Sequence, residues 1–251
     1  MRTLTPTNPP RPPLFACLPS REVLDHVASV LDPDSMLSGR ELARAEALIS
    51  PNSRRDFVAA RVLTRLLLRR WHDPGAALTS IADIVLAQTC TECGGPHGRP
   101  ADVFGLGVSW AHAGGFVAAA VGRGPVGVDV EPAAPDGAAA RAGRRADGRT
   151  DGRAVVLGRP TSVRAWVRGE AILKWGHGTL DDALGWLPEL DGRLATRGQQ
   201  YVMDDEGRPR RTRRRVPAPS GLVLTDAPTA LDGAVCSVAA GQAAGWVNPA
   251  R

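Results

Sequence analysis

The sequence predicts a protein that combines helices and strands. Residues 116–121 (FVAAAV) and 127–132 (GVDVEP) are short apolar or β-branched segments joined by a Gly/Pro turn at 122–125, as is typical of strands. Residues 53–71 and 162–175 instead space their apolar side chains as helices do, and each begins at a serine. The 251 residues are enough for one large or two small hydrophobic cores.

The segment 127–132 carries two acidic residues. On a strand, the side chains of residues i and i+2 point the same way, so Asp129 and Glu131 face one side and Val128 and Val130 the other. Two carboxylates on one face repel each other unless a positive charge lies between them. One alternative is a strand end with a solvated acidic edge. The other is a divalent cation, and Mg²⁺ suits a site with two or three carboxylates plus substrate phosphates.

A second group of polar residues lies on the helix predicted at 162–175, which Ser162 can cap and Gly176 can end. Trp166, Glu170 and Lys174 fall at i, i+4 and i+8, on one side of this helix. Glu170 and Lys174 could form an ordinary surface ion pair worth roughly a few tenths of a kcal/mol. However, Lys174 is the only lysine, and every other member of the Lys+Arg count of 31 is arginine. Because lysine is a compact charge that can release a proton, its use here favours a chemical role.

Together, GVDVEP and the later W-x-x-x-E-A-x-x-K pattern at 166–174 resemble the 4′-phosphopantetheinyl transferases of the surfactin (Sfp) type. Those enzymes transfer the phosphopantetheine arm of coenzyme A to a serine of an acyl or peptidyl carrier protein. The resemblance covers about residues 38–240 and is strongest in three short blocks. It implies an α+β fold of two pseudo-symmetric α/β halves, with the active site at their interface.

The resemblance also sets the expected organisation of the chain. We expect a flexible tail at 1–20, an N-terminal half at 21–122 with the coenzyme A-binding helix and strands, and a C-terminal half at 123–251 with the metal and catalytic motifs. Residues 1–13 are rich in Pro and Thr and lack the apolar core of a signal peptide.

Composition limits the partners and the compartment. The formal charge of +5 and the pI of about 9.6 suit an anionic ligand, an acidic protein partner or nucleic acid. No apolar run approaches ~20 residues, so we expect no membrane span. Four cysteines without an export signal predict reduced thiols and a cytoplasmic protein. We expect a monomer.

Basic residues line one side of the helix predicted at 53–71. Arg54, Arg61 and Arg65 lie at i, i+7 and i+11. A solvated basic face is one alternative. In the resembled family this helix lines the coenzyme A site, so the resemblance implies that these arginines bind phosphate, which guanidinium groups do well. An earlier helix is predicted to begin at the capping box of Ser38 and Glu41. Its apolar face would consist of Leu42, Ala45 and Ile49, and we expect Pro51 to end this helix.

Two further segments resemble family motifs. Residues 90–100 (CTECGGPHGRP) invite a zinc or redox interpretation, but no second C-x-x-C follows to complete a zinc site. They resemble a family turn whose lysine meets the nucleotide end of coenzyme A, and Arg99 stands at that position. Residues 108–116 (VSWAHAGGF) resemble a segment whose histidine touches the coenzyme A phosphates, here His112. Ala111 and Ala113 replace hydroxyl residues beside it, and the alternative for His112 is a structural role.

Other segments depart from the family. Residues 133–159 predict a long loop or weak helix where the family carries a carrier-docking helix, although their arginines could attract an acidic carrier. Gly169 replaces a lysine and costs up to about 1 kcal/mol inside a helix. Residues 204–215 combine an acidic turn with a basic cluster and predict a hairpin arm or solvated loop, and alternation around Leu222 and Val235 predicts closing strands. We expect no nucleic-acid partner, because no recognised binding motif accompanies the basic cluster.

The resemblance implies a mechanism. Mg²⁺ is expected as the cofactor, held by Asp129, Glu131 and Glu170 and by the pyrophosphate of coenzyme A. Glu170 is the candidate base for the serine hydroxyl, and Lys174 stabilises or protonates the leaving adenosine 3′,5′-bisphosphate. The alternative is a non-catalytic coenzyme A-binding relative that has lost carrier docking. A basic nucleic-acid-binding protein would leave the acidic residues and the single lysine unexplained.

Overall fold

The computed structural model combines helices and sheets and confirms the α+β class. The residues that it describes are 11–73, 75, 77–82, 84–90, 93–95, 98–133, 162–176, 178–190, 201–203, 209–211, 218–227, 233–242 and 244–247. The predictions for the segment 133–159 and for the basic cluster within 204–215 therefore fall almost entirely outside the described residues, as does His97.

The strands form two main sheets. The first has the order β2-β3-β1-β9 and consists of β1 (Leu14–Pro19), β2 (Gly107–Ala113), β3 (Phe116–Gly122) and β9 (Gly245–Trp246). The second has the order β4-β8-β7 and consists of β4 (Val126–Pro132), β7 (Val223–Asp226) and β8 (Ala234–Ala240). A separate pair consists of β5 (Tyr201–Met203) and β6 (Pro209–Arg211). Within the main sheets, β1 and β9 pair in parallel and the other pairs are antiparallel.

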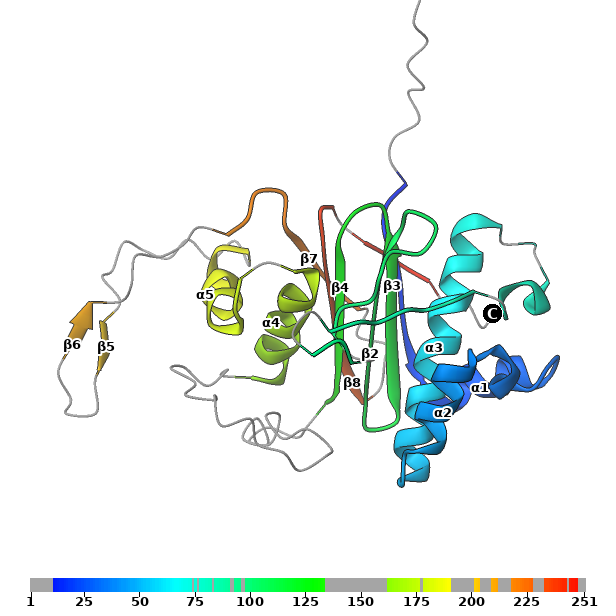
Figure 1. The fold of residues 1–251 in the computed structure, drawn as a ribbon. Helices are drawn as coiled ribbons and strands as arrows, with labels where there is room; N and C mark the ends of the chain where they lie inside the picture. The colour runs from blue at the N-terminus through cyan, green and yellow to red at the C-terminus, as the bar shows by residue number, and fades with distance from the viewer. Residues whose placement is uncertain are drawn as a thin grey trace, which may run out of the picture.

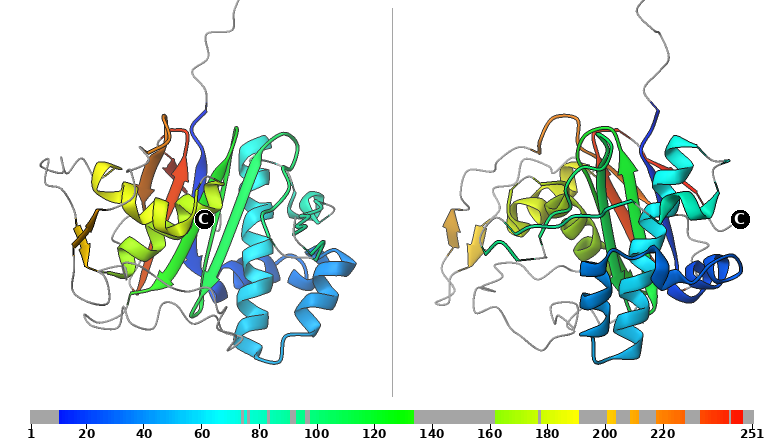
Figure 2. Two further views of the ribbon diagram at one scale, coloured as in Figure 1. Left: turned by 60° about the vertical axis from the view of Figure 1, so that its left-hand side comes forward. Right: turned by 45° about the vertical axis from the view of Figure 1, so that its right-hand side comes forward.

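Helices cover the outer sides of the two sheets (Figures 1 and 2). The first side carries α1 (Ser20–Ala28), α2 (Gly39–Glu46) and α3 (Pro51–His72), with the short 3₁₀ helices η1 (Pro33–Met36) and η2 (Leu78–Ile81). The second side carries α4 (Val163–Trp175) and α5 (Leu180–Leu190). Among the described helices, none has the length and apolar character needed to cross a membrane.

Strand alternation places the core between the two sheets. Val126, Val128 and Val130 of β4 are buried in one apolar cluster with Phe15 and Cys17 of β1. The intervening residues of β4 face α4 on the other side of the second sheet, since successive side chains of a strand point to opposite faces. The predicted separation of the acidic and valine residues of this strand is therefore confirmed.

The first strand corrects the expected N-terminal tail. Residues 1–20 were expected to be flexible, but Leu14–Pro19 form β1, which pairs with β3 on one side and β9 on the other. Residues 14–18 are all buried. Their run of apolar residues shows no alternation because both faces of this strand are covered, which is why the periodicity did not reveal it.

The boundary between α2 and α3 also differs from the prediction. The capping box of Ser38 and Glu41 is confirmed, but α2 ends at Glu46 and Ile49 is fully exposed. Pro51 does not end this helix; it begins α3, because its fixed φ suits the first turn of a helix. Ser50 is the cap of α3, and its side chain accepts a hydrogen bond from the backbone N–H of Ser53.

The helix α4 is fixed at both ends and against the second sheet. Ser162 caps its start, and Gly176 ends it with a left-handed φ of 105°, both as predicted. Arg168 anchors the helix to β7, donating hydrogen bonds of 3.2 and 2.6 Å to the two carboxylate oxygens of Asp226. These contacts hold the middle of α4 against the second sheet.

Two glycines allow α4 to pack closely. A Cβ atom at Gly127 of β4 would lie 2.1 Å from the carbonyl oxygen of Ala171 and 2.4 Å from the backbone nitrogen of Trp175, so strand and helix backbones touch there. A Cβ atom at Gly169 would lie 2.8 Å from Leu184 Cδ2 of α5, a helix that the sequence analysis did not predict. Gly169, which departs from the family pattern, is therefore the position where α5 packs on α4.

We predict that Gly127→Ala lowers the free energy of unfolding by about 3 kcal/mol, because the new methyl group must push the backbone of α4 away from β4. Urea unfolding followed by circular dichroism measures this change. Gly39→Ala is the matched control: a Cβ atom at this first residue of α2 meets nothing within 4 Å, so its stability should stay the same or rise slightly. Equal stability of the two variants would contradict the close approach.

Candidate functional site

An ion pair joins β4 to the last turn of α4. The Nζ atom of Lys174 donates a hydrogen bond of 2.6 Å to Oδ1 of Asp129. Asp129 is buried, with 7% of its surface exposed, whereas 32% of the Lys174 side chain is exposed. The structure thus brings together two predicted site residues that lie 45 positions apart in the sequence.

The second oxygen of the Asp129 carboxylate, Oδ2, is buried and has no hydrogen-bond partner among the described residues. Burial raises the pKa of Asp129, and the charge of Lys174 opposes this effect. A buried polar atom without a partner usually costs about 1–3 kcal/mol. Oδ2 is therefore an acceptor that is suited to a bound ligand.

Two more carboxylates lie beside this pair. Glu131 is two residues further along β4, on the same face as Asp129, and is half-buried. Burial and the charges of Asp129 and Glu170 raise the pKa of Glu131 to about 7, although Lys174 opposes this rise. The carboxylates of β4 and α4 are thus close enough to influence one another.

The chemistry of these side chains fits a hard divalent cation. Carboxylate oxygens are the ligands that Mg²⁺ prefers, usually one or two from the protein with the rest from water and phosphates. The buried Oδ2 atom of Asp129 offers such a ligand. Within the part of the chain that the structure describes, however, no group of three or more His, Cys, Asp or Glu side chains is placed so that it could hold a metal ion by itself. A cation here would need ligands from water or substrate as well.

Arg61 of α3 is held by two aromatic rings and a hydrogen bond. Its guanidinium lies 3.8 Å from the ring centroid of Phe57 and 4.9 Å from that of Trp110. It also donates a 3.2 Å hydrogen bond to Oε1 of Gln88. Burial lowers the pKa of Arg61 to about 10, so this group stays positively charged at pH 7.

The other two arginines of this stripe have partners within the protein. Arg65 is fully buried; its Nη2 atom donates a 2.7 Å hydrogen bond to Oε2 of Glu41 and its Nε atom donates one of 3.0 Å to the carbonyl of Ile84. Arg54 pairs with Asp34 at 2.5 Å. The stripe is therefore not a solvated basic face. Phosphate binding by Arg65 stays a prediction, and it would require the buried ion pair with Glu41 to open.

The charges of both Arg61 of α3 and Lys174 of α4 act on the imidazole of His112. It is on an exposed residue near the end of β2. Partial removal of its imidazole from water lowers the pKa of His112, and the positive charges of Arg61 and Lys174 lower it further. The negative charge of Asp56 opposes this effect. Because the side chain is exposed, water offsets part of this effect, but the direction leaves the imidazole neutral at pH 7. His112 is thus close enough to both groups to sense their charges.

Arg99 lies against the C-terminal end of α4. A Cβ atom at Gly176 would be 1.9 Å from Nη1 of Arg99, so the guanidinium covers this glycine. A cation is favourable at the C-terminus of a helix because of the helix dipole. Gln88, which accepts from Arg61, also donates a 2.7 Å hydrogen bond to the carbonyl of Gly98. Two hydrogen bonds therefore connect Arg61 to the segment that carries Arg99.

Two residues that support this region were not predicted. Asp56 is buried in α3 and accepts hydrogen bonds from Oγ of Ser20 at 2.6 Å and from the backbone N–H of Gly115 at 3.1 Å. It thereby holds the turn between β2 and β3, next to His112. Ser109 of β2 accepts a 3.1 Å hydrogen bond from the backbone N–H of Val128 and so joins the two sheets. The available signal for Asp56 is that it is the only acidic residue of α3.

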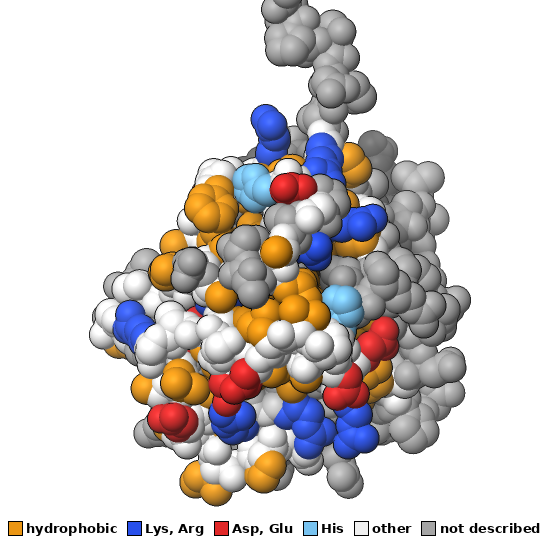
Figure 3. Space-filling view, turned by 90° about the vertical axis from the view of Figure 1, so that its right-hand side faces the viewer, with side chains coloured by type: hydrophobic (Ala, Val, Ile, Leu, Met, Phe, Trp, Pro, Cys, Tyr) orange, Lys and Arg blue, Asp and Glu red, His pale blue; other side chains and the backbone are white. Residues whose placement is uncertain are grey.

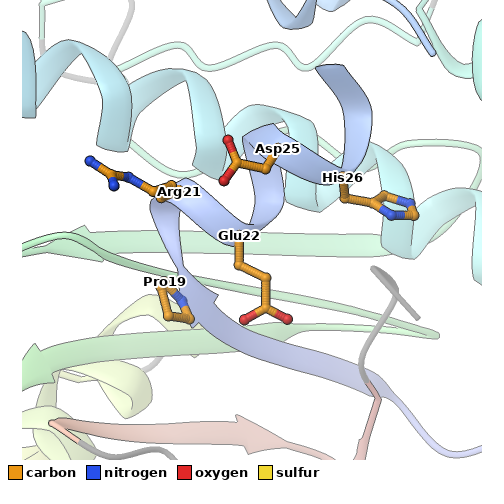
Figure 4. A pocket seen from close by; sticks show the side chains of 5 residues that line it. All are labelled: Pro19, Arg21, Glu22, Asp25 and His26. Carbon is orange, nitrogen blue, oxygen red and sulfur yellow. The ribbon is translucent and has the colours of Figure 1, made fainter. Parts of the chain in front are cut away.

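A hollow lies on the surface around α1, far along the chain from the acidic cluster. Its lining residues are Pro19, Arg21, Glu22, Asp25 and His26. Their side chains point in different directions rather than toward one another (Figure 4). On the molecular face that carries α1, α2 and α3, acidic and basic side chains are interspersed (Figure 3). Neither feature assembles a set of groups for chemistry.

Comparison with known proteins adds no identification. No family model matches this sequence, and no curated protein matches it at a significant level. The function must therefore be inferred from the motifs and from the arrangement of the side chains.

We predict that Glu131 makes the protein less stable as the pH rises. Its pKa is about 7 in the folded state against 4.5 as the ordinary value, so between these values the folded state retains a proton that the unfolded state releases. The contribution of Glu131 to the free energy of unfolding is at its maximum below pH 4.5, and it is lost as the pH rises through 7. In unfolding titrations across this range, Glu131→Gln should gain stability relative to the wild-type protein as the pH increases. A constant difference between the two proteins would contradict this expectation.

We also predict that Arg65 is essential for stability. Arg65→Met leaves the carboxylate of Glu41 buried without its cation, and breaking such a pair typically costs about 3–5 kcal/mol. Adding Glu41→Gln, which keeps the capping side chain but removes its charge, should recover part of this loss. Chemical unfolding of the single and double variants measures both effects. Wild-type stability of Arg65→Met, combined with weaker coenzyme A binding, would instead make Arg65 a ligand contact.

Proposed function

We propose that this chain is a Mg²⁺-dependent 4′-phosphopantetheinyl transferase. It transfers the phosphopantetheine group of coenzyme A to a serine of an acyl or peptidyl carrier protein and releases adenosine 3′,5′-bisphosphate. One observation carries the proposal: Lys174, the only lysine of the chain, donates a hydrogen bond to the buried carboxylate of Asp129, and the charges of Asp129, Glu170 and Lys174 all act on Glu131. These are the residues on which the motif resemblance depends.

The arrangement of the sheets supports an active site between two pseudo-symmetric halves. Each main sheet has helices on its outer side, and apolar side chains fill the space between the sheets. In this proposal the first half supplies Arg61, Arg99 and His112, and the second half supplies the acidic cluster and Lys174. The hydrogen bond between Val128 and Ser109 joins the halves beside the site.

The basic residues would bind the nucleotide end of coenzyme A. Arg61 is positively charged and held between two aromatic rings, so little side-chain entropy is lost when it binds a phosphate. The exposed guanidinium of Arg99 is available at the end of α4. A neutral His112 can donate one hydrogen bond to a phosphate oxygen. Arg54 would contribute through its partly exposed guanidinium.

Asp129, Glu131 and Glu170 would hold the magnesium ion. When bound, it would neutralise charge on the pyrophosphate of coenzyme A. The buried Oδ2 atom of Asp129, which has no hydrogen-bond partner among the described residues, supports this assignment. The pKa of Glu131, which burial and then the charge of Asp129 raise, supports it as well.

The remaining chemistry is assigned to α4. The serine oxygen of the carrier forms a bond to the phosphorus of phosphopantetheine, and the bond from that phosphorus to the bridging oxygen breaks with its electrons on the bisphosphate. Glu170 accepts the serine proton, and Lys174 stabilises the leaving phosphate by donating a hydrogen bond or a proton. Lys174 must release Oδ1 of Asp129 to do this.

The alternative is a coenzyme A-binding relative that does not catalyse transfer. Ala111 and Ala113 beside His112, and the use of Gly169 to pack α5, are the features that favour it. The alternative predicts coenzyme A binding without any loading of carrier proteins. Incubation with coenzyme A, Mg²⁺ and a panel of apo-carrier proteins, followed by intact-protein mass spectrometry, distinguishes the two.

For the transferase, we predict that Glu170→Gln and Lys174→Ala each lower the rate of carrier loading at least about 100-fold, because each removes a proton-transfer or charge-stabilising group. Mass spectrometry of the carrier measures the rate. Circular dichroism should show that both variants remain folded.

The matched control is Glu46→Gln, which makes the same chemical change at an exposed position of α2. It should load the carrier at the wild-type rate. If Glu170→Gln or Lys174→Ala keeps the wild-type rate, the role assigned to that residue is wrong. If the wild-type protein binds coenzyme A but loads no carrier, the non-catalytic alternative replaces the proposed reaction.

A further inference from the structure

The Lys174–Asp129 pair differs from an ordinary buried ion pair. The carboxylate side chain of Asp129 is 9% exposed, but that of Lys174 is 32% exposed, so solvent reaches the cation of the pair. Buried ion pairs that serve stability have their remaining hydrogen-bonding capacity satisfied. Here the ammonium contacts Oδ1 at 2.6 Å, while Oδ2 has no partner among the described residues.

The ammonium of Lys174 also acts on a second carboxylate. Burial and the charges of Asp129 and Glu170 raise the pKa of Glu131, and the charge of Lys174 opposes this rise. A divalent cation would bring twice that charge to the same position.

From these observations we infer that Lys174 is an intramolecular competitor of the divalent cation. In the cation-free protein its ammonium occupies the coordination position at Oδ1 of Asp129, and it leaves this oxygen when a cation binds. The inference rests on the cation site of the proposed function and adds a regulatory step to it: the protein blocks its own site until cation and substrate are both present.

The structure explains how this exchange occurs without a change of fold. The backbone of α4 is pressed against β4 at Gly127, so the helix itself has no room to shift toward the strand. The lysine side chain, by contrast, is a flexible stem of four carbons with a compact charge. Rotation of this side chain is enough to move the ammonium from Asp129 toward solvent or toward an anionic ligand.

The competition has a thermodynamic consequence. Apparent affinity falls in proportion to the fraction of molecules whose site is free, so a lysine that occupies the carboxylate about nine-tenths of the time weakens cation binding about tenfold. A phosphate-bearing ligand gives the released ammonium a new partner. Cation and phosphate ligand therefore favour each other's binding, because each stabilises the state in which Lys174 has left Asp129.

Mn²⁺ binding measured by electron paramagnetic resonance, without coenzyme A or carrier, tests the inference. We expect Lys174→Met to bind Mn²⁺ at least about tenfold more tightly than the wild-type protein. Arg164→Met is the matched control for charge, since it removes one cation of the same helix that pairs with Asp226 rather than with Asp129. It should tighten binding less than about twofold. An equal effect of both variants, or no effect of Lys174→Met, overturns the inference.

A second measurement uses the wild-type protein, so it does not depend on the folding of Lys174→Met. Because the chain has one lysine, isotope labelling of lysine Cε gives a single side-chain resonance. Adding Mg²⁺ should move this resonance toward its position in Asp129→Asn, whereas a potassium salt of equal ionic strength should not. Cation binding that leaves the resonance in place overturns the inference.

The outcomes separate this inference from the proposed reaction. If neither the wild-type protein nor Lys174→Met binds Mn²⁺, the inference is wrong together with the cation site. If Lys174→Met shows the tenfold tighter binding but the wild-type protein loads no carrier, the competition is supported and only the proposed transfer is wrong.

Discussion

The close contact between α4 and β4 at Gly127 is the constraint on which the site depends. With no side chain at this position, the carbonyl of Ala171 and the amide of Trp175 approach the strand to distances that a Cβ atom would forbid. The contact holds the last turn of the helix beside Asp129, because Asp129 is two residues after Gly127 and lies on the same face of β4. Lys174, between Ala171 and Trp175, is thereby placed within 2.6 Å of the Asp129 carboxylate.

The same strand contributes to the core and to the site, and this couples stability to function. Val128 and Val130 fill the space between the two sheets, while Asp129 and Glu131 face α4. A shift of one residue in the pairing of β4 with β8 would exchange these two sets, burying the acids in an apolar core. The apolar packing between the sheets therefore also specifies the position of the carboxylates.

Local sequence patterns predicted the strand and helix that carry the site, but they did not predict the structure around these two elements. The caps of α4 and the alternation of β4 depend on neighbouring residues, so the sequence was sufficient to place Asp129, Glu131, Glu170 and Lys174 on defined faces. The burial of Arg65 was not predictable in this way, because it depends on Glu41, 24 residues away, and on the carbonyl of Ile84. Likewise β1 lacks alternation because its two faces pack in different cores. The helix α5 packs on α4 through Gly169, a contact that periodicity cannot reveal.

The energetics of the acidic cluster favour a ligand over a structural explanation. Burial raises the pKa values of Asp129 and Glu131, and the charges of Asp129 and Glu170 raise that of Glu131 further, which means that the charged forms of both are less stable in the folded protein than in water. Apolar residues of similar size at these positions would avoid this cost, as they often do when they replace buried charges. Lys174 offsets part of it. Because its side chain is one-third exposed, water screens its charge, and the pair contributes less than a fully buried pair would. Sites that reduce stability in this way are typical of binding and catalysis, where the missing positive charge arrives with the ligand.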